Sequence, residues 1–141
     1  MTINEKQDQI IEIFNEFTDW MDKYAYIIEL GNQLPPIDPK SKINQNLIEG
    51  CQSRVWLDAK YENGKIHFIG ESDAVIVKGI VSLLIDVLSD RTPDEILNAD
   101  LYFIDKIGLK EHLSPTRANG LLAMIKQIKL YALALKSTKQ Q

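Results

Sequence analysis

The spacing of apolar residues predicts helices before and after a short β-sheet. Between positions 3 and 30, hydrophobic side chains recur at intervals of three and four, which is typical of one face of a helix, continuous or broken near Thr18. Thr2 and Glu5 have the spacing of a capping box, and Gly31 suits the residue that follows a helix. The next segment holds three prolines, which exclude a helix and predict an ordered loop or an extended chain.

Residues 55–72 predict a β-hairpin. Asn63 and Gly64 tolerate the positive φ angles of a two-residue type I′ turn, and this turn sets the register of the strands. The predicted pairs are Glu62 with Lys65, Tyr61 with Ile66, Ala59 with Phe68 and Leu57 with Gly70, and on the other face Lys60 with His67 and Asp58 with Ile69. The first face is apolar and is expected to pack on helices.

Helices are predicted again after the hairpin. The patterns place them at residues 74–88, from Thr92, from Asp100 to Gly108 and from Ser114 onward. Ser72 or Asp73 is expected to cap the first, and Pro115 suits the first position of the last, long helix. The chain is therefore predicted to have an α+β fold, a small antiparallel β-sheet packed against helices, in one domain over residues 1–141.

Charge and composition argue against some classes of partner, namely nucleic acids and membranes. With 20 acidic and 16 basic side chains the net charge is −4, which argues against nucleic acid as a partner. No apolar run reaches the roughly 18 residues of a membrane-spanning helix, and the N-terminus shows no secretory or transit signal, so a cytoplasmic location without membrane contact is expected. Acidic residues gather in the first thirty positions, whereas the last helix holds five basic residues and no acid. These faces are interpreted as solvated surfaces, or as surfaces that attract each other or partners.

The chain's one cysteine, Cys51, is the candidate reactive group and lies in the stretch LIEGCQSRVW. A free cysteine is most often a small buried residue. The neighbours of this one are instead polar or flexible: Glu49, Gly50, Gln52, Ser53 and Arg54. They predict a loop with the thiol at or just below the surface. Arg54 would favour the reactive thiolate, and Glu49 would oppose it.

The residues give little support to a cysteine hydrolase or a metal centre. A hydrolase needs an imidazole beside the thiol. His67 falls on the polar face of the hairpin, and His112 lies in a loop where a structural hydrogen bond suits it better. One cysteine and two histidines have no metal-ligand spacing, and no glycine-rich phosphate-binding motif occurs. We therefore expect no metal or cofactor in this chain, and we expect the chemistry of Cys51 to depend on another protein.

Arg117 is the second residue of interest. Ser114, Pro115 and Gly120 have structural explanations as a helix cap, a first-turn residue and a small packing residue. A guanidinium at a helix start gains nothing from the helix dipole, whose positive end is there. Arg117 therefore predicts a contact with a carboxylate or with a partner.

Two segments, GCQSRVW at residues 50–56 and HLSPTRANGLLAMI at residues 112–125, resemble the signature segments of the SufE family of sulfur-acceptor proteins. The resemblance covers nearly the whole chain and includes the LPP and TPDEIL segments in the same order. It implies a fold similar to that of the IscU scaffold proteins. One cysteine is too few to ligate a cluster, so building the cluster itself is not indicated.

The resemblance implies that Cys51 accepts sulfur from the persulfide of a cysteine desulfurase, similar to SufS, and passes it to an iron–sulfur scaffold, similar to SufB. Such a protein is a sulfur carrier and an activator of the desulfurase, not an enzyme, and the pyridoxal phosphate belongs to the partner. Cys51 would be partly buried in the free protein, and Arg117 would position the loop or dock the desulfurase. The residues expected to carry the thiol into the partner are Gly50, Gln52, Ser53 and Arg54.

Other functions remain open from the residues alone. Cys51 could oxidise to a sulfenic acid and act as a redox sensor. The chain could also be an interaction module in which the cysteine is incidental. A homodimer is open as well, since an exposed apolar residue near the loop, such as Trp56, would serve a self-contact as readily as a partner contact.

Overall fold

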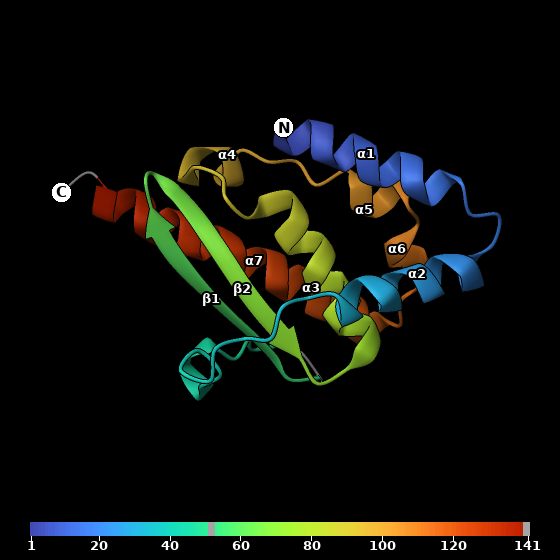
Figure 1. Cartoon of the computed structure of the whole chain (residues 1–141), viewed down its shortest axis with the longest axis horizontal. Coiled ribbons are helices and arrows are strands. Elements are labelled where there is room, and N and C mark those ends of the chain that lie inside the picture. The colour runs from blue at the N-terminus through green and yellow to red at the C-terminus, as the bar shows by residue number, and fades with distance from the viewer. Residues whose placement is uncertain (51–52, 140–141) are drawn as a thin grey trace.

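A computed structural model describes residues 1–50 and 53–139, and it shows helices packed against a β-hairpin (Figure 1). The helices are α1 (Ile3–Asn15), α2 (Trp20–Asn32), α3 (Val75–Leu88), α4 (Pro93–Leu97), α5 (Phe103–Lys106), α6 (Leu109–His112) and α7 (Pro115–Lys139), with a 3-10 turn η1 (Asn44–Asn46). The strands β1 (Val55–Glu62) and β2 (Lys65–Ser72) form an antiparallel sheet. The predicted α+β fold is confirmed.

The β-hairpin has the predicted register at every pair. Its turn residues Asn63 and Gly64 adopt positive φ angles of 54° and 78°, as a two-residue turn requires. The apolar face packs against α3 and α7, where the ring of Phe68 meets that of Tyr131 edge to face with 6.3 Å between centroids. The hairpin and α7 are thereby held together along one side of the molecule (Figure 1).

Helix α3 occupies the centre of the fold, between the hairpin and α2 (Figure 1). It contacts α1, α2, β2 and α7, and most of its side chains are buried. Its N-cap is Ala74, which makes no side-chain cap bond. The prediction that Ser72 or Asp73 caps this helix is wrong, because neither side chain accepts from the first turn of α3. Both bind the backbone of Arg54, and the Ser72 hydroxyl also accepts from the N–H of Ala74 at 3.2 Å.

The N-terminal helical stretch is divided into α1 and α2, which was one of the two predicted alternatives, and Asp19 caps α2. The prediction that Gly31 follows a helix end is wrong, since α2 continues to Asn32. Gly31 instead faces Gly79 of α3, and a Cβ built on Gly31 would lie 2.7 Å from the Gly79 backbone nitrogen. The two glycines allow the backbones of α2 and α3 to approach closely.

The remaining helix boundaries follow local signals. Thr2 and Thr92 begin α1 and α4 with the predicted capping boxes, and Pro115 is the first residue of α7. The helix predicted from Asp100 to Gly108 is shorter, since α5 begins at Phe103, and Gly108 follows it with a left-handed φ of 76°. The loop predicted around His112 is wrong, because α6 begins directly after Gly108 and ends at His112. No helix in the described part of the chain is long and apolar enough to cross a membrane.

The contact between α2 and α3 yields a stability prediction. A Cβ on Gly79 would lie 2.1 Å from the carbonyl oxygen of Ile27, so Gly79→Ala must force the helices apart. We expect the free energy of unfolding to fall by about 1–3 kcal/mol or more. Urea denaturation measures this, with Glu12→Ala at an exposed position of α1 as a control expected within about 0.5 kcal/mol of the wild type. A wild-type stability for Gly79→Ala would contradict the close contact.

Candidate functional site

The loop of residues 50–54 connects the segment after η1 to β1 and begins beside α7. Cys51 and Gln52 lie outside the described residues, so the partial burial of the Cys51 thiol stays a prediction. Gly50, directly before them, has a φ of +89°, a backbone conformation that favours glycine. A Cβ built on Gly50 would lie 3.5 Å from the Cβ of Ala123 on α7. The chain therefore enters the loop in close proximity to α7.

The loop ends at Arg54, whose backbone is bound on both sides. The Arg54 N–H donates to Oδ1 of Asp73 at 3.0 Å. The Arg54 carbonyl accepts from the Ser72 hydroxyl at 2.9 Å and from the Asp73 N–H at 3.2 Å. The two residues that were predicted as helix caps thus fasten the end of the loop to the end of β2.

A cavity of about 120 Å³ lies at the end of the loop, where Ser53 is one of its lining residues. The other lining residues come from α3 and α7: Val77, Ile80, Thr116, Arg117, Gly120 and Met124. Ser53 and Arg117 were predicted separately, from segments far apart in the sequence. The fold brings these two candidates to one cavity. Ser53 is the residue that follows Cys51 and Gln52 in the chain.

Arg117 is exposed in the first turn of α7, where its backbone N–H donates to the Ser114 hydroxyl at 3.3 Å. Its guanidinium makes no ion pair with any residue in the ranges 1–50 and 53–139. The carboxylate contact that we predicted for Arg117 is therefore absent from the described part of the chain. The alternative, a contact of Arg117 with a partner protein, stays a prediction.

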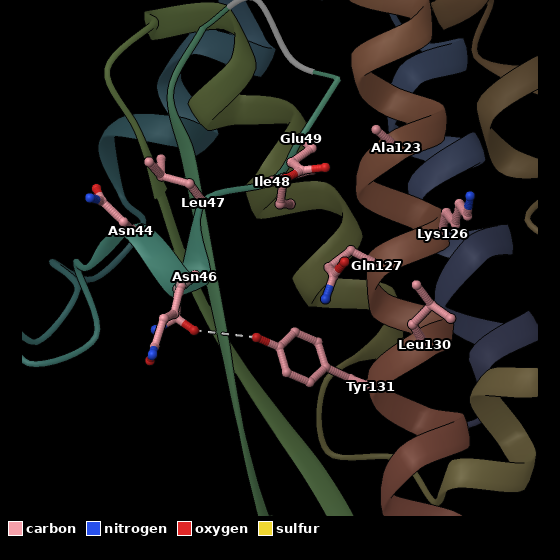
Figure 2. A pocket seen from close by; sticks show the side chains of 11 residues that line it. Asn44, Asn46, Leu47, Ile48, Glu49, Ala123, Lys126, Gln127, Leu130 and Tyr131 are labelled. Atoms are coloured by element: carbon pink, nitrogen blue, oxygen red, sulfur yellow. Dashed lines mark hydrogen bonds between the residues drawn. The ribbon is translucent and has the colours of Figure 1, made fainter.

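A larger groove of about 550 Å³ adjoins the other end of the loop (Figure 2). One wall is the segment of residues 44–49, which leads to Gly50, and the other is the middle of α7. Ala123 belongs to the α7 wall and also faces Gly50. The walls present amide, charged and apolar side chains, among them Asn44, Asn46, Glu49, Lys126, Gln127 and Leu130.

The hydroxyl of Tyr131 connects α7 to both neighbouring segments. It donates to the carbonyl of Leu57 in β1 at 3.0 Å, and Oδ1 of Asn46 in η1 is a second acceptor at 3.4 Å (Figure 2). Burial raises the pKa of Tyr131, and the negative charge of Asp58 adds to this shift. The hydroxyl therefore keeps its proton at neutral pH and remains a donor.

The proline-containing segment is ordered and covers part of the polar face of the hairpin. The Ser41 hydroxyl donates to Oδ2 of Asp58 at 2.7 Å, and the Lys42 ammonium lies 4.7 Å from the ring centroid of Trp56. Trp56 is in consequence only 8% exposed. The expectation that Trp56 is free for a self-contact is wrong, because residues of this segment cover it.

The histidines do not line the cavity or the groove. His67 is exposed and its Nδ1 pairs with Asp90 at 2.9 Å. His112 binds the Gly108 carbonyl through Nδ1 at 2.8 Å and stacks on Trp20, which agrees with the structural role predicted for it. Among the residues that the structure describes, no three His, Cys, Asp or Glu side chains are grouped as metal ligands.

Several residues of the site carried no functional signal in the sequence. Tyr131 was interpreted only as part of the apolar stripe of the last helix, and Gln127 fell between its apolar positions. Asn46 belonged to a loop without a pattern, and Asp73 had a sufficient explanation as a cap. Helical spacing reports which face of α7 is buried, but it does not report which segment lies against that face.

Comparisons with known proteins were consistent with the fold and the segment order. The family model described as SufE, Fe-S metabolism associated domain, matches residues 8–132. The solution structure of a hypothetical protein from Thermus thermophilus is similar with a TM-score of 0.77 and 23% sequence identity, over 94% of this chain and 96% of that chain. At this identity, the second likeness concerns the fold alone.

The hydrogen bond between Arg54 and Asp73 can be tested directly. Asp73→Ala removes the acceptor of the Arg54 N–H, so this amide should exchange faster with solvent. A net contribution of about 1 kcal/mol corresponds to roughly fivefold faster exchange. Hydrogen exchange followed by NMR measures it, and Asp73→Asn, which keeps an oxygen acceptor, should exchange close to the wild-type rate. Equal rates in Asp73→Ala and wild type would show that the bond does not hold the loop.

Proposed function

Since this chain belongs to the SufE family, we propose that it is a sulfur carrier for iron–sulfur cluster assembly. Cys51 accepts a sulfur atom from the persulfide of a cysteine desulfurase and passes it to an assembly scaffold. The chain stimulates the desulfurase by relieving it of sulfur and is not itself an enzyme. The observation that carries this proposal is the family match over residues 8–132, a range that contains both Cys51 and Arg117.

The transfer is an exchange at sulfur in which no external oxidant or reductant takes part. The Cys51 thiolate attacks the outer sulfur of the donor persulfide. A new S–S bond forms there, and the bond between that sulfur and the donor cysteine breaks. The electron pair leaves with the donor thiolate, which takes up a proton. A thiolate of the acceptor then attacks the outer sulfur of the Cys51 persulfide in the same way.

The cavity beside Ser53 supports a sheltered persulfide. Its volume of about 120 Å³ is several times the roughly 10–15 Å³ that one water molecule needs. Val77, Ile80 and Met124 give one part of it an apolar lining, and Ser53, Thr116 and Arg117 give the rest a polar one. We propose that the outer sulfur of Cys51 occupies this cavity between encounters with partners.

The partners supply the remaining chemistry. Pyridoxal phosphate belongs to the desulfurase, which resembles SufS in this proposal, and the receiving scaffold resembles SufB. The chain itself uses no cofactor and no resident metal. We place the protein in the cytoplasm, where reducing conditions keep Cys51 available as a thiol.

Intact-protein mass spectrometry tests the carrier function. The wild-type chain is mixed with an active cysteine desulfurase and free cysteine, without reductant, beside a Cys51→Ser control. We expect the wild type to gain the mass of one sulfur atom, reversibly with dithiothreitol, and the control to gain none. No gain with an active cognate desulfurase would overturn the carrier function and favour a redox sensor or an interaction module.

Arg117 is proposed to position the loop or to dock the desulfurase. Its place on the cavity beside Ser53 supports this role, as does the lack of an ion pair to its guanidinium within the described ranges. We expect Arg117→Ala to lower desulfurase binding or stimulation by roughly threefold to tenfold, with a thermal midpoint close to that of the wild type. Titration with the desulfurase and turnover assays measure this, with exposed Lys60 on β1 changed to Ala as the control. If both binding and stimulation were unchanged in Arg117→Ala, the role would be withdrawn.

A further inference from the structure

We propose that the groove between residues 44–49 and α7 binds an extended segment of the desulfurase that donates the sulfur, with an acidic side chain of that segment against Lys126. The proposal rests on the proposed function, because it names the part of the carrier that holds its donor. The groove has a volume of about 550 Å³, which is within the range of ligand-binding pockets and larger than the volume of the cavity beside Ser53. Its lining residues are distinct from those of the cavity beside Ser53.

The lining of the groove suits a polypeptide backbone. Asn44 on one wall and Gln127 on the other bring amide groups, which donate and accept hydrogen bonds at the same time. The Asn46 amide also lies on the first wall, where it already donates to the Ser41 carbonyl and accepts from the Tyr131 hydroxyl. An extended chain presents N–H and carbonyl groups alternately, so it can pair with such side chains along its length. Figure 2 shows these side chains on both sides of the groove.

The charge on the α7 wall favours an acidic side chain on the side of the occupant that faces this helix. Helix α7 contains no acidic residue in a chain whose net charge is −4. Lys129 donates to the Ala99 carbonyl, and Lys136 pairs with Asp94. Lys126 is exposed, lines the groove, and has no ion-pair partner among residues 1–50 and 53–139. An acidic side chain of the donor would complete this pair at the α7 wall, whereas Glu49 on the opposite wall would repel it.

Leu130 provides an apolar anchor one helical turn from Lys126. It is 47% exposed and lines the groove. Glu49, on the opposite wall, lies at the end of the groove that leads to Gly50. The occupant thus meets an ammonium and a leucine on one wall and a carboxylate on the other, an asymmetry that favours one direction of the bound segment.

The position of the groove explains what docking there would achieve. Ala123 lies between the groove and Gly50, so a segment bound in the groove ends beside the loop that carries Cys51. Holding the donor at this point makes the sulfur exchange effectively intramolecular, which raises its rate without any change at the thiol.

The experiment uses a purified cysteine desulfurase as the probe and measures its affinity for the full-length chain by calorimetry at low and high salt. Lys126→Glu should weaken binding by about threefold to tenfold and reduce the salt dependence, and Leu130→Ala should weaken it by about fivefold. Matched controls are Lys60→Glu, which reverses an exposed charge outside the groove, and Leu133→Ala, on the same helix and 53% exposed but not in the groove. Both controls should bind like the wild type, and thermal midpoints confirm that all variants fold.

The outcomes separate the two proposals. Wild-type affinity in both groove variants, together with normal sulfur uptake by the wild type, would overturn the groove and leave the carrier function standing. Weakening of all four variants alike would also overturn it. Self-association of the free chain that is lost in Lys126→Glu, with desulfurase affinity unchanged, would assign the groove to a second copy instead. Failure of the wild type to take up sulfur at all would overturn both proposals.

Discussion

The Tyr131 hydroxyl is the interaction on which the arrangement of the site depends, because it joins three segments that are distant in sequence. It binds the carbonyl of Leu57 in β1 and approaches Oδ1 of Asn46, while its ring packs against Phe68. The spacing between α7, the hairpin and residues 44–49 follows from these contacts. That spacing leaves the groove open on one side and places Gly50 against Ala123.

The two described ends of the 50–54 loop are placed in different ways. At Gly50, the positive φ turns the chain next to α7, and at Arg54 the backbone binds Ser72 and Asp73. These anchors define where residues 51 and 52 begin and end. In the proposed carrier function, this fixed base would let the loop present its thiol to a partner.

Helix α7 serves two different surfaces along its length. Its first turns, with Arg117, line the small cavity beside Ser53, and its middle, with Lys126, lines the groove. A 25-residue helix is rigid enough to keep the two at a constant separation. The proposed storage of a sulfur atom and the proposed recognition of its donor would then be combined on one helix.

Local signals in the sequence determined the hairpin and several of the helix starts. Asn63 and Gly64 can adopt the positive φ angles that a two-residue turn requires, and this turn sets the register of the whole hairpin. Helix starts are marked by the capping boxes at Thr2 and Thr92 and by Pro115 at the first position of α7. The tertiary structure alone decided which of these elements meet. The pairing of Gly31 with Gly79, the binding of Arg54 by Ser72 and Asp73, and the meeting of Ser53 with Arg117 join segments that are far apart in the chain. Such contacts depend on how whole faces pack, and periodicity records only that a face is buried, not what buries it.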